Sequence, residues 1–173
     1  MKNKRVETKI NFNTLLVKKL VKDVCLPEYM MESDVGLEIK ANENVNLMPM
    51  EQKTVKTGIA IKIPEGHVGL IRDRAGIVDK MGVHTSAGTF DPAYTGEVSV
   101  MLINLGDEEV AVEKGMRIAQ LVVLPIQKVQ VKEVKELPAT SRGEKGFGST
   151  GISPTGIKEK VKLFNELYKK MPK

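Results

Sequence analysis

The sequence predicts an all-β domain, and three of its features lead to that prediction. Apolar residues recur at every second position over short segments, turn-forming residues separate these segments, and the middle of the chain holds a single short helix candidate, residues 76–81. Short strands at regular spacing are typical of β-sandwiches and β-barrels. An α/β fold would instead need helical segments between the strands, so the pattern argues against one.

Five segments carry the strand pattern. Four of them alternate apolar residues with other residues, whereas residues 118–126 are almost continuously apolar, as is typical of a strand buried on both faces. Turn formers follow two of the segments, at residues 64–66 (Pro-Glu-Gly) and 113–115 (Glu-Lys-Gly). The predicted strands are residues 55–63, 98–103, 110–112, 118–126 and 129–134.

The last part of the chain departs from this pattern. Residues 139–151, ATSRGEKGFGSTG, are too rich in Gly, Ser and Thr to pack as a strand, so we expect a mobile arm there. After Ser153-Pro154, apolar residues recur at 4-3-4-3 spacing with lysines outside their stripe, which predicts an amphipathic helix over residues 155–171. The stripe consists of Ile157, Val161, Phe164, Tyr168 and Met171.

The net charge of +5 lies at the two ends of the chain. Seven Lys/Arg and one Glu give residues 1–22 a charge of +6, six Lys and two Glu give residues 152–173 a charge of +4, and the body is acidic. Such ends either keep the chain soluble or contact nucleic acid or a partner. The expected regions are a basic segment partly in the first strand (1–22), a β domain (23–138), the Gly-rich arm (139–151) and a basic helical extension (152–173).

Composition excludes several classes of protein. Aromatic residues make up 4% of the chain and Trp is absent, so we expect no nucleic-acid binding by base stacking. The single Cys25 cannot form an internal disulfide, and neither His67 nor His84 is near a Cys cluster that would suggest a zinc site. No apolar run reaches the roughly 18 residues of a membrane helix, and no signal peptide is evident. We therefore expect a cytoplasmic protein with no membrane contact.

Two segments suggest a site for phosphates or for catalysis. Arg74-Ala75-Gly76 follows a strand, and an Arg with backbone N–H groups opening a short helix is a natural phosphate site. Residues 88–96, Gly-Thr-Phe-Asp-Pro-Ala-Tyr-Thr-Gly, form a predicted hairpin whose Asp91 is either a turn former or a functional carboxylate.

Two further features bear on function. Gln120 lies inside an apolar run, where its amide needs a hydrogen-bond partner, so a paired core Gln is the simplest interpretation. The arm carries a lone Phe147, and exposed aromatic residues in arms often close over a ligand. Asp73 is most simply an ion-pair partner, and His84 a polar residue of a loop or near the site.

Taken together and in order, these segments resemble the trimeric dUTPases, the deoxyuridine triphosphate nucleotidohydrolases. The resemblance covers about residues 27–151, and its most specific part is the run GFGSTG at the end of the arm. The five matching motifs are residues 34–41, 74–76, 88–104, 115–121 and 142–151.

The resemblance implies a β jelly roll of the β-clip type, in agreement with the strand pattern. It also implies a homotrimer whose sites lie between subunits, with each arm reaching over a neighbouring site. The implied reaction converts dUTP and water into dUMP and pyrophosphate by attack of water on the α-phosphorus, which limits uracil in DNA and supplies dUMP for thymidylate synthesis.

The resemblance also assigns roles to individual residues. Asp91 would orient and deprotonate the water, Gln120 would lie near the α-phosphate, and Glu38 would reach a Mg²⁺ ion on the triphosphate through water, with no direct side-chain ligand to the metal. Tyr94 would lie under the deoxyribose. The remaining substrate-binding positions are Gly88, Thr89, Phe90 and Ser99 for uracil, Arg74, Ala75 and Gly76 for phosphates, and Arg142, Phe147, Gly148, Ser149 and Thr150 from the arm.

Three positions depart from the family pattern. Glu38 stands where the family has Asp, Ala75 where it has Ser, and Met116 where an acid is usual. A lost hydroxyl–phosphate hydrogen bond costs about 1–3 kcal/mol, so we expect reduced or altered activity. The departures also leave open a dUTPase-like nucleotide sensor or interaction protein without catalysis.

A dCTP deaminase is the other alternative. Residues 81–88, Met-Gly-Val-His-Thr-Ser-Ala-Gly, look somewhat like that family. Deamination needs a carboxylate on the strand after the hairpin to move protons at cytosine C4. The matching residue is Met101, and its thioether cannot transfer protons.

Overall fold

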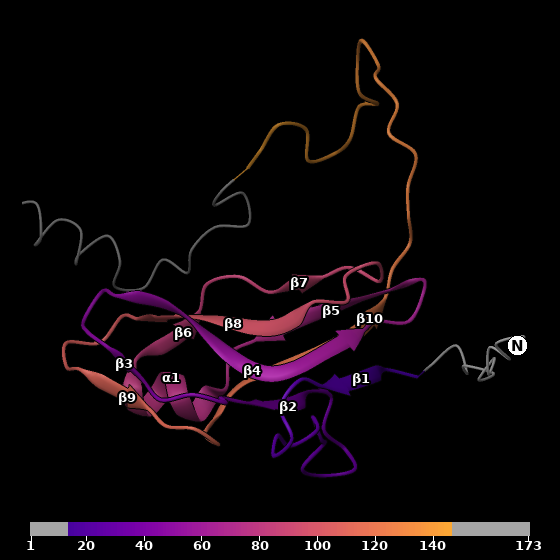
Figure 1. Cartoon of the computed structure of the whole chain (residues 1–173). Coiled ribbons are helices and arrows are strands. Elements are labelled where there is room, and N and C mark those ends of the chain that lie inside the picture. Colours follow the sequence, from indigo (N-terminus) through magenta and orange to yellow (C-terminus); the bar gives the residue numbers. More distant parts are fainter. Residues whose placement is uncertain (1–13, 147–173) are drawn as a thin grey trace, which may run out of the picture. The chain divides into compact units, whose positions relative to one another are not determined.

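The structure, a computed structural model, describes residues 14–146, and strands dominate it (Figure 1). One short helix accompanies them in these residues, and it lacks the length and hydropathy to span a membrane. The elements are β1 (Leu16–Lys19), β2 (Leu37–Lys40), β3 (Val45–Leu47), β4 (Gln52–Lys62), β5 (His67–Arg72), α1 (Ala75–Met81), β6 (Val83–Thr85), β7 (Thr89–Phe90), β8 (Glu97–Asn104), β9 (Val110–Val112) and β10 (Arg117–Pro125).

The strands form two four-stranded antiparallel sheets and one two-stranded sheet. The first sheet has the order β1-β4-β8-β6, the second β2-β10-β5-β7, and β3 pairs with β9. Burial along β8 alternates strictly, with Val98, Val100 and Leu102 inside, as the two-residue period predicted. These residues share one core with Ile39 and Leu121 of the second sheet, so both sheets contribute to one apolar interior. The predicted all-β class is confirmed.

The chain divides into two units, residues 1–129 and 130–173, which we describe separately.

Strands predicted at 55–63, 98–103, 110–112 and 118–126 correspond to β4, β8, β9 and β10. The strand predicted at 129–134 is wrong, because these residues have no strand partner and Val131 is 97% exposed. Alternation alone does not make a strand when no neighbouring backbone completes the ladder. In β10, both faces are buried only in the first half, and Leu124 is exposed.

Residues 88–96 do not form the predicted hairpin. β7 pairs with β5 in the second sheet, whereas β8 pairs with β4 and β6 in the first sheet. The segment between them is therefore a crossing from one sheet to the other, and it turns where the Tyr94 N–H donates to the Asp91 carbonyl at 3.0 Å. Asp91 thus lies on an exposed turn between the sheets.

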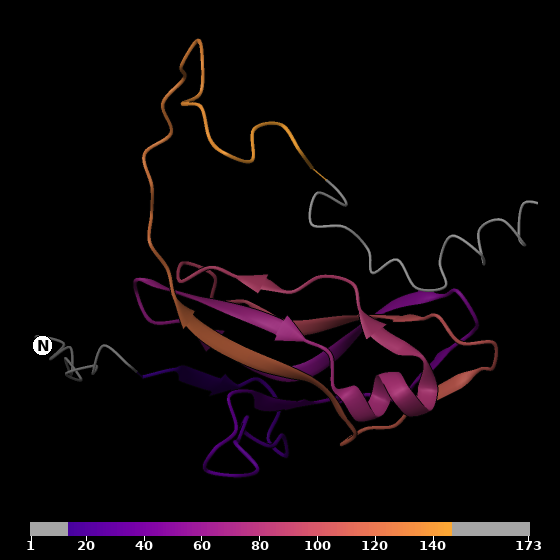
Figure 2. The same cartoon turned by 180° about the vertical axis from the view of Figure 1, so that it is seen from behind.

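The helix predicted at 76–81 is confirmed as α1, which follows β5 directly. Its apolar anchor is the buried Ile77, and Lys80 lies in its last turn. Gly82 ends the helix in the left-handed conformation (φ 63°), and its N–H donates to the Val78 carbonyl at 3.0 Å. Figure 2 shows the molecule from behind, with α1 beside the start of β10, where a cavity is shared with residues 115–117. Arg74 and Gly76 therefore line the same cavity as the turn that precedes β10.

Replacing Gly88 by Ala should destabilise the fold. Gly88 has a φ of +152°, and a Cβ there would lie 2.3 Å from Cβ of Ile71, which is buried on β5. Because the Gly88 carbonyl also accepts the Ile71 N–H at 2.8 Å, the two chains cannot separate freely. We expect a loss of about 3 kcal/mol in the free energy of unfolding, measured by denaturant titration.

The control for this substitution is Gly146→Ala, where a Cβ would meet no atom within 4 Å. It should leave the unfolding free energy within about 0.5 kcal/mol of the parent protein. Equal effects of the two substitutions would contradict the close approach of Gly88 to Ile71.

Candidate functional site

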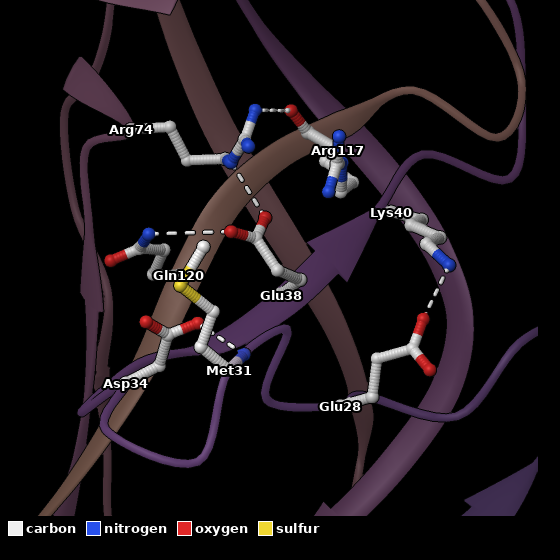
Figure 3. Close-up of polar contacts among 8 residues, drawn as sticks. All are labelled: Glu28, Met31, Asp34, Glu38, Lys40, Arg74, Arg117 and Gln120. Carbon is white, nitrogen blue, oxygen red and sulfur yellow. Dashed lines mark hydrogen bonds and ion pairs between the residues drawn. The ribbon is translucent and has the colours of Figure 1, made fainter. Parts of the chain in front are cut away.

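Three side chains from motifs far apart in the sequence meet at one place, shown in Figure 3. Glu38 on β2 and Gln120 on β10 are directly opposite each other in the antiparallel register, so their side chains share one face of the sheet. Gln120 Nε2 donates to Glu38 Oε1 at 3.3 Å. The expectation that the Gln120 amide is paired is confirmed, and its acceptor is a carboxylate.

Arg74 completes this cluster from the start of α1. Its Nε lies 2.6 Å from Glu38 Oε2, and its terminal NH1 donates to the Arg117 carbonyl at 3.1 Å. Glu38 is only 5% exposed, so the carboxylate depends on this cation for charge compensation. The Nε–H does not point at Oε2 with hydrogen-bond geometry, and neither buried atom has another hydrogen-bond partner among the described residues. Charge, rather than an aligned hydrogen bond, holds the pair.

A glycine of the first motif allows Gln120 to reach Glu38. A Cβ on Gly36 would lie 2.7 Å from Oε1 and 2.9 Å from Cβ of Gln120. The Gln120 side chain therefore lies flat against the backbone of Gly36. Any larger residue at 36 would push the amide away from the carboxylate.

Further cations surround this cluster. Arg117 is opposite Lys40 in the strand register, and Lys40 Nζ contacts Glu28 Oε1 at 2.9 Å. The hydrogen bond to Glu28 raises the pKa of Lys40 above its ordinary value, although burial and the Arg117 charge act to lower it. Within residues 14–146, Lys40 and Arg74 each have a carboxylate partner, whereas no ion pair is formed by Arg117.

A cavity of about 490 Å³ adjoins Arg74 between α1 and the turn before β10. Three cationic side chains contribute to its wall and no acidic one does. A pocket with that charge suits a phosphate group, because guanidinium and ammonium groups donate strong hydrogen bonds to anionic oxygens. The lining residues are Arg74, Gly76, Ile77, Lys80, Met81, Gly115, Met116 and Arg117.

Sequence reasoning did not single out Lys80 and Arg117 for this cavity. Arg117 stands inside the fourth motif, three residues before Gln120, and Lys80 lies six residues after Arg74. The available signal was that each is a basic residue close in sequence to a motif residue, Lys80 to Arg74 and Arg117 to Gln120.

The third motif forms a second group of residues around the turn at Asp91. The Phe90 and Tyr94 rings lie 5.7 Å apart at a tilt of 57°, and the Tyr94 hydroxyl donates to the Glu97 carbonyl at 2.9 Å. Asp91 is exposed, and Ser99 lies on β8 opposite Lys56. No hydrogen bond or ion pair in the described part of the chain joins this group to the Glu38 cluster.

Asp73 has a larger role in the structure than its place between two arginines suggested. Its carboxylate accepts hydrogen bonds from the Thr85 N–H (2.7 Å) and hydroxyl (2.6 Å) and contacts His84 Nδ1 at 2.9 Å. Burial alone would raise the pKa of Asp73, but the hydrogen bonds from Thr85 and His84 outweigh it and lower the pKa below the ordinary value. The charged-group contact of Asp73 is thus with His84, on β6, and it is an ion pair only when the imidazole is protonated.

The second unit is described only up to residue 146. Arg142 is exposed there, and its Nε donates to the Lys145 carbonyl at 2.9 Å. Four predicted site residues and the predicted helix at 155–171 lie outside the described residues. The four are Phe147, Gly148, Ser149 and Thr150.

Residues 14–146 contain no group of three or more Asp, Glu, His or Cys side chains placed to hold a metal ion. The Glu38 carboxylate and the Gln120 amide carbonyl are hard oxygen donors, the type that Mg²⁺ prefers, but two such residues do not make a complete metal site. An Mg²⁺ ion would therefore need most of its ligands from another molecule.

Replacing Glu38 by Gln should destabilise the protein substantially. The change removes the negative charge that compensates Arg74, whose side chain is only 22% exposed. Breaking a buried ion pair from one side costs about 3 kcal/mol or more. The matched control is Glu28→Gln: its partner Lys40 is about as buried as Arg74 (23% exposed), but the Glu28 side chain is 54% exposed, so the change should cost less than about 1 kcal/mol. Denaturant unfolding of both variants measures the difference, and similar losses would contradict the importance of burial.

The Asp73 network should make stability depend on pH in the acidic range. Because the folded-state pKa of Asp73 lies below its unfolded value, the network stabilises the protein above the ordinary Asp pKa, and this stability is lost as the pH falls through the lowered pKa. Unfolding free energies of the parent protein and Asp73→Asn, measured from about pH 7 to about pH 3, should converge toward the acid end. A constant difference across that range would contradict the shift.

Comparisons with known proteins show the family to which the chain belongs. A dUTPase family model matches residues 22–151. The deoxyuridine 5'-triphosphate nucleotidohydrolases of Clostridium kluyveri and Hydrogenobaculum sp. are 48% and 50% identical, covering 79% and 80% of this chain and 97% and 98% of their own lengths. The dUTPase of Staphylococcus bacteriophage 80alpha with dUPNHPP has a TM-score of 0.76 at 35% identity, covering 81% of this chain and 99% of that one. The chain belongs to the dUTPase family.

Proposed function

We propose that the protein hydrolyses dUTP to dUMP and pyrophosphate by attack of water on the α-phosphorus. The observation that carries the proposal is the meeting of Glu38, Arg74 and Gln120 beside a cavity walled by cations, in a chain of the dUTPase family. Two relatives that are 48% and 50% identical to this chain are deoxyuridine triphosphate nucleotidohydrolases, and the match covers almost the whole length of each.

The phosphates would bind at Arg74 and Gly76 and extend along the cavity. Gly76 is exposed and a Cβ there would meet nothing within 4 Å, so the backbone is open to a ligand. The Glu38 carboxylate and the Arg117 carbonyl hold the guanidinium of Arg74 in place before substrate arrives. A preorganised cation stabilises the charge that develops on phosphate oxygens without first having to reorient.

Asp91 would serve as the general base. Its carboxylate is exposed on a turn, so it can accept a proton from a water molecule placed against the α-phosphorus. The turn is held on both sides, by the Tyr94 N–H bonded to the Asp91 carbonyl and by the Tyr94 hydroxyl bonded to the Glu97 carbonyl.

Uracil would be recognised by the main chain of residues 88–94. β7 is the last strand of its sheet, so one row of N–H and C=O groups at Thr89 and Phe90 has no strand partner. Such groups can pair with the uracil edge, and cytosine would leave them unsatisfied. The Tyr94 ring, 44% exposed, is available to lie under the deoxyribose and exclude a 2′-hydroxyl. From the family resemblance, Ser99 on β8 would contact uracil.

The active site would be shared between the subunits of a homotrimer. Glu38 on β2 and Thr89–Phe90 on β7 stand at opposite edges of the same sheet, which supports this arrangement, because a neighbouring subunit could supply the missing half. From the family resemblance, Arg142 would contact the γ-phosphate, Phe147 would stack on uracil, and residues 148–150 would add hydrogen bonds.

We propose Mg²⁺ as the cofactor, bound to the triphosphate. Glu38, a hard oxygen donor, would contact the ion through its water ligands, and the paired Gln120 would lie near the α-phosphate. When bound, the ion would neutralise part of the triphosphate charge. A related dUTPase from phage phi11 of S. aureus, solved as a mutant, coordinates a structural Mg(II) ion.

Ala75 favours a second candidate, a nucleotide sensor that binds dUTP without turnover. It is exposed at the start of α1, where the family's Ser would offer a hydroxyl to phosphate. The loss of one such hydrogen bond at the transition state slows the reaction about 10- to 100-fold.

We place either activity in the reducing cytoplasm, in keeping with the exposed, free thiol of Cys25.

The proposal is tested by measuring pyrophosphate release from dUTP, dCTP, dTTP and UTP with Mg²⁺. We expect turnover of dUTP alone, and a loss of at least about 100-fold in kcat for Asp91→Asn, since a general base contributes that much or more. The control is Asp107→Asn, an exposed acid outside the cluster.

Each other outcome has a distinct meaning. Tight binding of dUTP without pyrophosphate release would favour the sensor, and ammonia released from dCTP would favour a deaminase. Full activity of Asp91→Asn would remove that carboxylate from the role of base.

A further inference from the structure

Asp73 joins the two sheets at the point where the phosphate-binding segment begins. It follows β5 of the second sheet directly, and its three contacts go to His84 and Thr85 on β6 of the first sheet. Both Asp73 oxygens are engaged, Oδ1 by Thr85 and Oδ2 by His84. A side chain that is about one-third exposed is thereby held in a single orientation.

The residue after Asp73 is Arg74, and the ladder of β5 with β10 ends one residue before Asp73, at Arg72 opposite Gln120. Arg74 is extended (φ −96°, ψ 119°), and no side chain caps the helix that it opens. On its far side, the Arg74 carbonyl accepts the N–H groups of Ile77 (2.9 Å) and Val78 (3.1 Å). Asp73 therefore fixes the chain before Arg74, and α1 fixes it after.

The side chain of Arg74 needs that backbone position. Its guanidinium reaches Glu38 on β2 and the carbonyl of Arg117 at the same time, at 2.6 Å and 3.1 Å. Both partners belong to the second sheet, so a shift of the Arg74 backbone would break at least one contact. A contact that fixes the backbone at Arg74 therefore also fixes the position of the Arg74 guanidinium.

We propose that Asp73, held by Thr85 and His84, is a positioning residue that sets the Arg74 guanidinium for binding the substrate's phosphates. The inference rests on the proposed function, because it takes Arg74 to be a phosphate ligand. Asp73 itself touches no substrate. Its two charged neighbours in sequence, Arg72 and Arg74, are not its ion-pair partners. The Asp73 carboxylate instead contacts β6 of the other sheet.

The test is a double-mutant cycle with Asp73→Ala and Arg74→Ala. Two quantities are measured for each variant with Mg²⁺: kcat and KM for dUTP, and the Kd of α,β-imido-dUTP by calorimetry. We expect Asp73→Ala alone to weaken analogue binding about 10-fold, as for a lost charged hydrogen bond. In the Arg74→Ala background the same change should have almost no further effect, because Asp73 acts through Arg74.

Two milder variants keep the test valid if Asp73→Ala folds poorly. Asp73→Asn retains an oxygen that accepts both bonds from Thr85, and it should restore most of the affinity. Thr85→Val removes one hydroxyl at nearly constant shape and should give a smaller loss that also vanishes without Arg74. Asp107→Ala, an exposed acid that contacts neither residue, should leave affinity unchanged in both backgrounds.

A merely structural role would give a different pattern. Equal losses with and without Arg74 would overturn the proposal, as would a loss of affinity that Asp73→Asn fails to restore. If the parent protein binds the analogue but does not hydrolyse dUTP, the proposed function fails and the binding cycle still decides the role of Asp73. If it binds neither dUTP nor the analogue, both proposals are wrong.

Discussion

The contact between Glu38 and Arg74 is the constraint on which the rest of the site depends. It places a carboxylate that is almost fully removed from water against a guanidinium that water still reaches. An unpaired charge at that depth is very costly, so each of the two residues restricts the other. The pair joins β2 to the start of α1, and through Gln120 it also includes β10. Three motifs are thereby brought together by one electrostatic requirement.

Sheet topology explains why this cluster and the Asp91 turn are separate. The second sheet begins with β2 and ends with β7, so Glu38 and Thr89 stand on strands at its opposite edges. The central strands β10 and β5 lie between them, and neither edge can move closer without breaking the ladder. The proposed homotrimer would bring the two groups together by taking one from each of two chains.

The sequence predicted those features that depend on neighbouring residues. The period of two along 98–103, the short helix at 76–81 and the need of Gln120 for a partner are all local signals. It did not predict which backbone would lie beside which, because pairing joins residues that are far apart in the chain. Hence residues 129–134 alternate without forming a strand, and residues 88–96 cross between sheets instead of folding back. The partner of Asp73 was hidden for the same reason, since Thr85 lies twelve residues away.

The longer side chain at position 38 has a consequence for protein engineering. Restoring the Asp that is usual in the family would shorten the reach of the carboxylate toward Nε of Arg74 and Nε2 of Gln120 at once. Gly36 already lets Gln120 lie as close to the backbone as an amide can, so Gln120 has little freedom to follow. Asp at position 38 is therefore not a neutral replacement in this chain. An exchange at position 38 would therefore disturb the contacts to Arg74 and Gln120 together.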